Sequence, residues 1–232
     1  MKLFTNNRKT ILSLDFERER TCPTICSYCY VKKTETLYPA YSRKIVANYE
    51  LAMKNPDAFA IELNLEYRKA RRSKSKTYSK LHKLPVRIYG SGDYIPQHLK
   101  FISKLDFKHY IISKSLTMST MGYHRKQLLM LPKLTKLILS FDADNLTNYT
   151  NVKRLFGKDR IGFSFTGTTK EFISAKQKGY KFTIFFNTEK NKKSILNARK
   201  QKEQCPCDTK LIPSEGACTK CNKCWRSSIK LS

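Results

Sequence analysis

Acidic residues, glycine, proline and long apolar runs are all scarce in this chain of 232 residues. It has 18 Asp and Glu against 46 Lys and Arg, with 8 Gly and 8 Pro. Few Gly and Pro argue against a flexible linker between domains. No apolar run reaches the roughly 18 residues that span a bilayer. We therefore expect one main globular domain with no membrane partner.

The start of the chain does not look like a secretion signal. A basic start over residues 1–9 leads into an apolar stretch that Ser13, Asp15 and Glu17 interrupt, whereas a signal peptide needs an unbroken apolar segment. We expect a cytoplasmic protein, located in the host cytoplasm if a virus encodes it. Thiols stay reduced there, so the eight cysteines are better explained by metal binding than by disulfides.

What the chain has in excess is positive charge, with a formal net charge of +28. Lysine and arginine contacts with phosphates release counterions and supply most non-specific affinity for nucleic acid. The densest basic run covers residues 68–76 and has Tyr67 and Tyr78 at its edges. The charge favours DNA or RNA as a partner. A lysine-rich composition that only keeps the protein soluble remains the alternative.

Three cysteines, Cys22, Cys26 and Cys29, lie close together with gaps of three and two residues. Thiolates select zinc or iron-sulfur clusters, and a cluster of four irons held by three cysteines keeps one iron open for a ligand. A structural zinc site usually closes with four ligands, and no histidine or fourth cysteine lies near this loop. The spacing favours the iron-sulfur site, with zinc as the alternative.

This C-x3-C-x2-C spacing, with Tyr28 just before the last cysteine, resembles the cluster loop of radical S-adenosylmethionine (SAM) enzymes. The resemblance implies a [4Fe-4S] cluster on the three cysteines and SAM bound to the open iron. It implies that one electron cleaves SAM to a 5′-deoxyadenosyl radical, with a flavodoxin or ferredoxin as reductant, and that Tyr28 contacts the adenine. The protein binds, orients and shields such a cofactor.

Strand-like and helix-like segments alternate along the chain. The apolar periodicity predicts strands at Ile11–Asp15, Val86–Gly90, His109–Ser113, Lys136–Phe141, Ile161–Thr166 and Lys181–Asn187. It predicts helices at Tyr41–Lys54, Asp57–Arg72, Pro96–Leu105, Gly122–Leu131, Asn145–Phe156, Thr169–Lys178 and Lys192–Gln204. Such alternation indicates a parallel sheet with crossover helices.

Six β/α units predict an α/β fold, a partial (β/α)6 TIM-like barrel over residues 1–204 with a helical, basic insertion at about 40–80. Radical SAM enzymes resemble one another in such a barrel, whose first strand leads into the cluster loop. Reactive residues of barrels lie on the loops that follow the strands. The cysteines at 22–29 follow the first predicted strand.

Polar residues at the ends of the next strands are candidate SAM contacts. A Gly-Gly-Glu-like segment after the second strand binds the methionyl amino group in radical SAM enzymes, so the resemblance implies this role for Ser91, Gly92 and Asp93, with Asp in place of Glu. Short hydroxyls and a lysine at strand ends suit the ribose and carboxylate of SAM. These candidates are Ser113, Lys114, Ser115 and Ser140. Each alone also fits an ordinary turn or helix cap.

Five further cysteines gather near the end of the chain. They are Cys205, Cys207, Cys218, Cys221 and Cys224. Their spacing predicts a cysteine-rich metal-binding extension over residues 205–232, holding either a second iron-sulfur cluster or a structural zinc. With the cluster loop and the strand ends, this extension resembles a radical-SAM-like family of phages and mobile elements whose reaction is unassigned.

The leading hypothesis is therefore a radical SAM enzyme that modifies a nucleic acid or a nucleotide. The rival hypothesis is a non-catalytic, zinc-binding protein that binds nucleic acid, in which both cysteine groups are structural. The sequence names no residue that reacts with the substrate.

Overall fold

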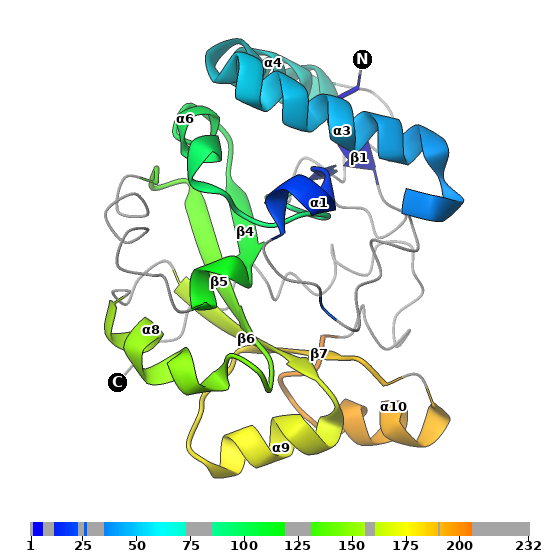
Figure 1. Cartoon of the computed structure of the whole chain (residues 1–232), viewed down its shortest axis with the longest axis vertical. Coiled ribbons are helices and arrows are strands. Elements are labelled where there is room, and N and C mark those ends of the chain that lie inside the picture. The colour runs from blue at the N-terminus through cyan, green and yellow to red at the C-terminus, as the bar shows by residue number, and fades with distance from the viewer. Residues whose placement is uncertain are drawn as a thin grey trace.

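The architecture comes from a computed structural model of the chain (Figure 1). The residues that the structure describes are 2–6, 12–22, 26, 35–72, 85–118, 131–155, 161–189 and 191–205. Tyr28, Cys29, Cys207, Cys218, Cys221 and Cys224 lie outside these ranges, as do residues 122–130 of the predicted helix at 122–131 and the tail beyond residue 205.

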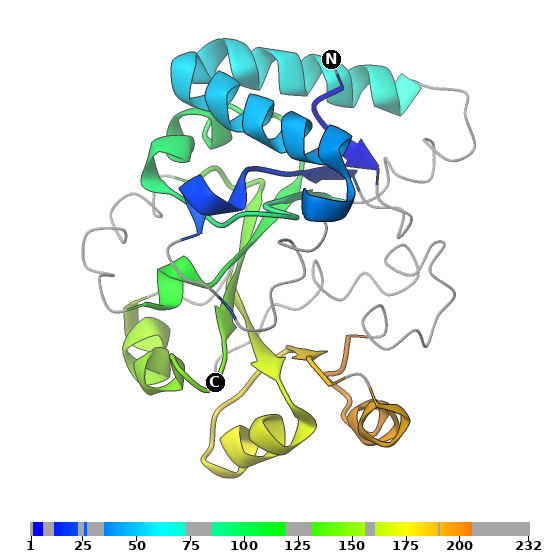
Figure 2. The same ribbon diagram turned by 45° about the vertical axis from the view of Figure 1, so that its right-hand side comes forward.

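One sheet of seven strands organises the fold, and its strands follow one another in chain order. The first strand pairs antiparallel with the second, and all later neighbours pair in parallel. The six parallel strands curl into a half-barrel (Figure 2). The strands are β1 Thr5–Asn6, β2 Leu12–Leu14, β3 Val86–Ile88, β4 His109–Ser113, β5 Thr135–Phe141, β6 Ile161–Gly167 and β7 Ile184–Asn187.

Helices follow the parallel strands, and α10 comes after the last of them. They are α1 Arg18–Thr21, α3 Pro39–Lys54, α4 Pro56–Arg72, η1 Pro96–His98, α6 Leu99–Ile102, η2 Ser115–Thr117, η3 Leu146–Asn148, α8 Tyr149–Leu155, α9 Thr169–Gln177 and α10 Lys192–Arg199. The pair α3 and α4 lies side by side at one end of the molecule, and α9 and α10 lie at the other (Figures 1 and 2). Among the described helices, none is long and apolar enough to cross a membrane.

The side chains of the strands belong alternately to two separate hydrophobic clusters, because successive residues of a strand point to opposite faces. The larger cluster holds most of the buried aromatic and aliphatic residues, including Ile111, Leu139 and Phe163, and the helices supply the rest of it. The smaller one joins Tyr110, Ile138, Ile184 and Cys205. The half-barrel is therefore held by packing on one face and keeps a smaller apolar patch on the other.

The parallel α/β architecture predicted from the sequence is confirmed, and β4 has its predicted bounds. Strand β1 was not predicted; it is two residues long. The prediction of a helix over Lys192–Gln204 is wrong at its end, because α10 stops at Arg199. Residues after it pair with β7 instead: Phe185 N donates to Glu203 O at 2.8 Å, and Cys205 N donates to Phe185 O at 2.8 Å.

Helices α3 and α4 fall within the predicted insertion and contact each other, and α4 also contacts α6; residues 73–80 of that insertion lie outside the described ranges. Proline opens each helix, at Pro39 and Pro56, where the missing backbone N–H is not needed. The loop before β4 holds α4 in place: Asn64 Nδ2 donates to Lys104 O at 3.0 Å, and Arg68 forms an ion pair with Asp106.

Candidate functional site

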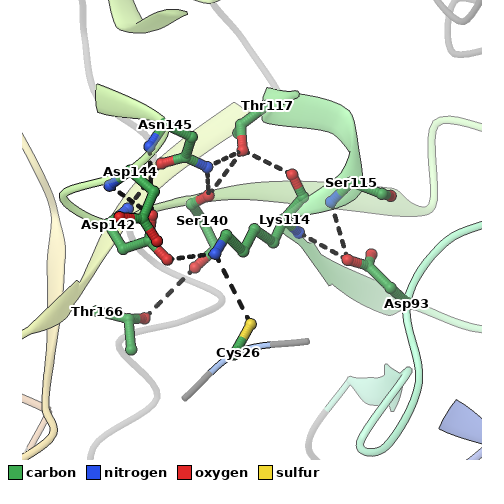
Figure 3. Close-up of polar contacts among 10 residues, drawn as sticks. All are labelled: Cys26, Asp93, Lys114, Ser115, Thr117, Ser140, Asp142, Asp144, Asn145 and Thr166. Atoms are coloured by element: carbon green, nitrogen blue, oxygen red, sulfur yellow. Dashed lines mark hydrogen bonds and ion pairs between the residues drawn. The ribbon is translucent and has the colours of Figure 1, made fainter. Parts of the chain in front are cut away.

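The candidate site lies where the parallel strands end. Asp93 follows β3, Lys114 follows β4 and Asp142 follows β5. Because carboxyl ends of parallel strands share one edge of a sheet, segments distant in sequence meet there. All three are anchored by the contacts described next, and Figure 3 shows Asp93, Asp142 and Cys26 joined to Lys114.

Lys114 is the centre of this group. Its ammonium forms an ion pair with the Asp142 carboxylate, and its Nζ lies 3.7 Å from Cys26 Sγ (Figure 3). Burial lowers the pKa of Lys114, but the hydrogen bond and charge of Asp142 and the charge of Cys26 outweigh it, so the pKa is raised. Lys114 is therefore held as a cation beside one thiol of the predicted cluster loop.

Asp93 joins the loops after β3 and β4. Its Oδ1 accepts a hydrogen bond from Tyr94 N at 2.6 Å, and its Oδ2 accepts from Lys114 N at 3.0 Å and Ser115 N at 2.8 Å. Burial raises the pKa of Asp93, and the hydrogen bonds to its carboxylate oppose that rise. The carboxylate thus positions the backbone that presents Lys114.

The predicted SAM segment, Ser91 and Gly92, is packed against the chain that enters the cluster loop. Ser91 Oγ donates to Phe16 O at 2.9 Å, and Asp93 N donates to Thr21 Oγ1 at 3.2 Å. Gly92 has φ +79°, and a Cβ there would lie 2.5 Å from Thr21 Oγ1. The glycine therefore permits a close approach to protein atoms, and its contact with SAM stays a prediction.

The turn after β3 is closely packed at Tyr89 and Gly90. A Cβ on Gly90 would lie 1.9 Å from Ser13 Oγ and 2.1 Å from Asp15 Oδ1. Tyr89 has φ 64°, which is uncommon for a large residue. It is fully buried, and its hydroxyl contacts His98 Nδ1 at 2.8 Å. Such strain persists only where surrounding contacts enforce it.

The predicted serines take part in the same network. Ser113 Oγ and Ser115 Oγ lie 3.0 Å apart, and Ser115 Oγ donates to Tyr94 O at 3.1 Å. Ser140 Oγ lies 3.4 Å from Thr166 Oγ1. These contacts hold the strand ends together, and a role toward ribose or carboxylate stays a prediction.

Two residues of the site were not expected from the sequence, Thr117 and Asn145. Asn145 Nδ2 bonds to Thr117 Oγ1 and to Ser140 O, and its Oδ1 accepts from Asp142 N at 2.7 Å. Asn145 follows Asp142 by three residues, which is a turn pattern that could have indicated it. Thr117 has no comparable sequence signal, since its partners come from the next strand.

Of the predicted metal ligands, Cys22, Cys26 and Cys205 are described. Cys22 caps α1, with its N–H bonded to Arg18 O at 2.7 Å, and Cys26 lies beside Lys114. Cys205 is buried beside β7, with its side chain against Tyr110, Ile138 and Ile184. Within the described ranges no three His, Cys, Asp or Glu side chains gather as a metal group. A thiol beside a partly buried cation suits a thiolate ligand.

Comparison with known proteins gives a match to a family model. The family model described as Gene product 88 matches residues 2–227. No curated protein and no solved structure matches the chain. The match concerns neither SAM nor iron, so those assignments stay predictions. Since it covers nearly the whole sequence, the chain belongs to the Gene product 88 family.

Proposed function

We propose that this protein is a radical SAM enzyme whose [4Fe-4S] cluster is held by Cys22, Cys26 and Cys29. The observation that carries the proposal is the position of Cys26. It lies at the carboxyl edge of a parallel half-barrel, 3.7 Å from the ammonium of Lys114. Three thiolates with one open iron and a cationic neighbour match what SAM chemistry needs at such an edge.

The residues at this edge have separable tasks in the proposal. The cysteine thiolates hold the cluster. The ammonium of Lys114 partly balances their negative charge, and Asp142 fixes that ammonium by an ion pair. Asp93 and Ser115 set the backbone between β4 and η2. The methionyl end of SAM lies against Ser91, Gly92 and Asp93 in this proposal, and the adenine lies against Tyr28.

When bound, a cluster of this kind supplies the electron that divides SAM into methionine and a 5′-deoxyadenosyl radical. A flavodoxin or ferredoxin replaces that electron in the proposal. Two carboxylates at these strand ends are shielded from solvent: Asp93 and Asp142 are 6% and 4% exposed. The cysteines of residues 205–224 hold a second cluster or a zinc. The substrate proposed for the radical is a nucleic acid or a nucleotide.

Metal content tests this proposal against a zinc-only protein. Anaerobically purified protein is expected to be brown and to contain about four irons and four sulfides for each cubane. The variant Cys26→Ala should lose the iron of the first cluster and keep its far-ultraviolet circular dichroism. Ser27→Ala, its neighbour, is the matched control and should keep the iron. Colourless protein that contains zinc and no iron after anaerobic reconstitution would reject the proposal.

A further inference from the structure

Charge is unevenly distributed along the direction of the strands. The loops that enter β4, β5 and β7 carry Lys108, Lys133 and Lys181, and all three side chains are exposed. Helix α4, which precedes β3, has Lys69, Arg71 and Arg72 in its last turn, also exposed. We call these six residues the basic edge. It follows the amino-terminal ends of the strands.

Acidic residues gather at the opposite edge. Among the described residues that enter the parallel strands, the one acidic side chain is Asp106, and Arg68 neutralises it in an ion pair. The loops that leave the strands carry Asp15, Asp93, Asp142, Asp144 and Glu189 instead. Among the described residues, the loops that leave the strands are therefore richer in acidic side chains than the loops that enter them, although Lys114, Arg18 and Arg20 also lie on the exit side.

Helix stability explains only part of this pattern. Cations in the last turn of a helix interact favourably with its dipole, which accounts for Lys69, Arg71 and Arg72. Lys108, Lys133 and Lys181 lie in loops, outside any described helix, and no ion pair in the described part of the chain involves them. Exposed lysines that form no ion pair with any described residue, in the loops that enter β4, β5 and β7, add local repulsion and need a further reason.

The arrangement of these lysines fits a linear polyanion. Neighbouring strands lie about 4.8 Å apart, so side chains that follow the strand ends form a row along the edge. A phosphodiester backbone offers a matching row of charges, and such contacts fix position without reading sequence. We propose that the basic edge binds nucleic acid through its phosphates, on the side of the sheet opposite Cys26 and Lys114.

This inference does not depend on SAM chemistry, because the two edges are separate. Neutralising the basic edge removes no residue of the cluster site. Loss of nucleic-acid binding and loss of SAM cleavage are thus independent observations, and either proposal can fail while the other stands.

The test compares two triple variants of equal net charge. K108Q/K133Q/K181Q neutralises the basic edge, and K54Q/K170Q/K193Q neutralises exposed lysines elsewhere. Binding of fluorescein-labelled single-stranded RNA and DNA is followed by fluorescence anisotropy across KCl concentrations. The edge variant should bind at least about tenfold more weakly at low salt, and its slope of log K against log salt should shrink by about two for a single strand. The control should keep the wild-type slope.

A charge-keeping variant guards against unfolding. K108R/K133R/K181R should bind as the wild type does, so that weak binding by the glutamine variant reflects charge. Equal losses in both glutamine triples would overturn the proposal, because the charge would then act diffusely. Tighter binding to vesicles containing phosphatidylserine than to nucleic acid at equal salt would also overturn it.

Discussion

The ammonium of Lys114 lies 3.7 Å from the thiol of Cys26, a residue 88 positions earlier in the chain. The same ammonium pairs with Asp142, so a single side chain connects the cluster loop with the ends of β4 and β5. Figure 3 shows Lys114 extended between these two partners. The sheet therefore positions the positive charge that lies beside the Cys26 thiol.

Removing the charge of Lys114 should destabilise the fold. In Lys114→Met the Asp142 carboxylate, whose side chain is 6% exposed, loses its ion pair. Breaking a buried pair by removing one partner costs about 3–5 kcal/mol. Urea denaturation should show that loss, and the double variant K114M/D142N should recover most of it. A loss below about 1 kcal/mol in the single variant would show that the pair is not buried in solution.

Replacing Asp93 should lower the stability of the fold, because its carboxylate accepts hydrogen bonds from backbone amides of two loops. Asp93→Asn replaces one acceptor oxygen with a donor that faces amides of Tyr94, Lys114 and Ser115. Leaving buried donors unsatisfied costs about 1–3 kcal/mol. Asp144→Asn is the matched control, since that side chain is exposed. Equal stabilities of the two variants in denaturant would contradict the bridging role of Asp93.

Gly90 and Gly179 provide a matched pair of glycines. A methyl group on Gly90 meets Ser13 and Asp15, whereas Gly179 has φ +87° and nothing within 4 Å of an added Cβ. Gly179→Ala should cost about 1–2 kcal/mol from backbone conformation alone. Gly90→Ala should cost about 1–3 kcal/mol through overpacking and should also lower the iron content. The prediction fails if Gly90→Ala keeps wild-type stability.

Two buried histidines should make the protein acid-sensitive. Burial lowers the pKa of His98 to about 3 and that of His109 to about 4, the latter despite a hydrogen bond to Phe107 O. An unfolded histidine has a pKa of about 6.5. Between these values the unfolded chain binds more protons, so stability falls as pH drops below about 6.5. The loss is on the order of 1 kcal/mol per pH unit for each histidine.

The measurement is the free energy of unfolding across this pH range for the wild type and for H98Q/H109N. Carboxylates also titrate on acidification and affect both proteins. The histidine effect is therefore the difference between the two slopes of unfolding free energy against pH. The variant should show the shallower slope. Parallel slopes would mean that the histidines are accessible to protons in the folded protein.

Periodicity was a reliable guide to the parallel sheet because its strands are short apolar runs, such as His109–Ser113, although β7 begins at Ile184 and not at the predicted Lys181. The end of α10 was not predictable, since residues 200–204 contain nothing that forbids a helix. Tertiary pairing of Gln204 with Phe185 decides it. Local pattern therefore predicted the elements, and contacts distant in sequence set this boundary.

In the candidate site, too, local sequence pattern indicated some residues, whereas contacts between distant residues could not be predicted. Asp93 was predicted from the resemblance of its segment to that of radical SAM enzymes, and Lys114 from its position at the end of an apolar strand. Their contacts were not predicted: Asp93 binds backbone amides, and Lys114 reaches Cys26. Asn145 was missed because its role depends on Thr117, which arrives from the loop after another strand. Sequence indicates which residues lie at an edge, whereas side-chain packing decides which of them touch.

Reductive cleavage of SAM at the cluster loop is measured most directly by the amounts of 5′-deoxyadenosine and methionine that form when anaerobically reconstituted protein is incubated with SAM and dithionite. We predict both products in equal amounts, and none from Cys26→Ala reconstituted in the same way. Iron-loaded protein that forms no 5′-deoxyadenosine, or Cys26→Ala that forms as much as the wild type, would contradict the account.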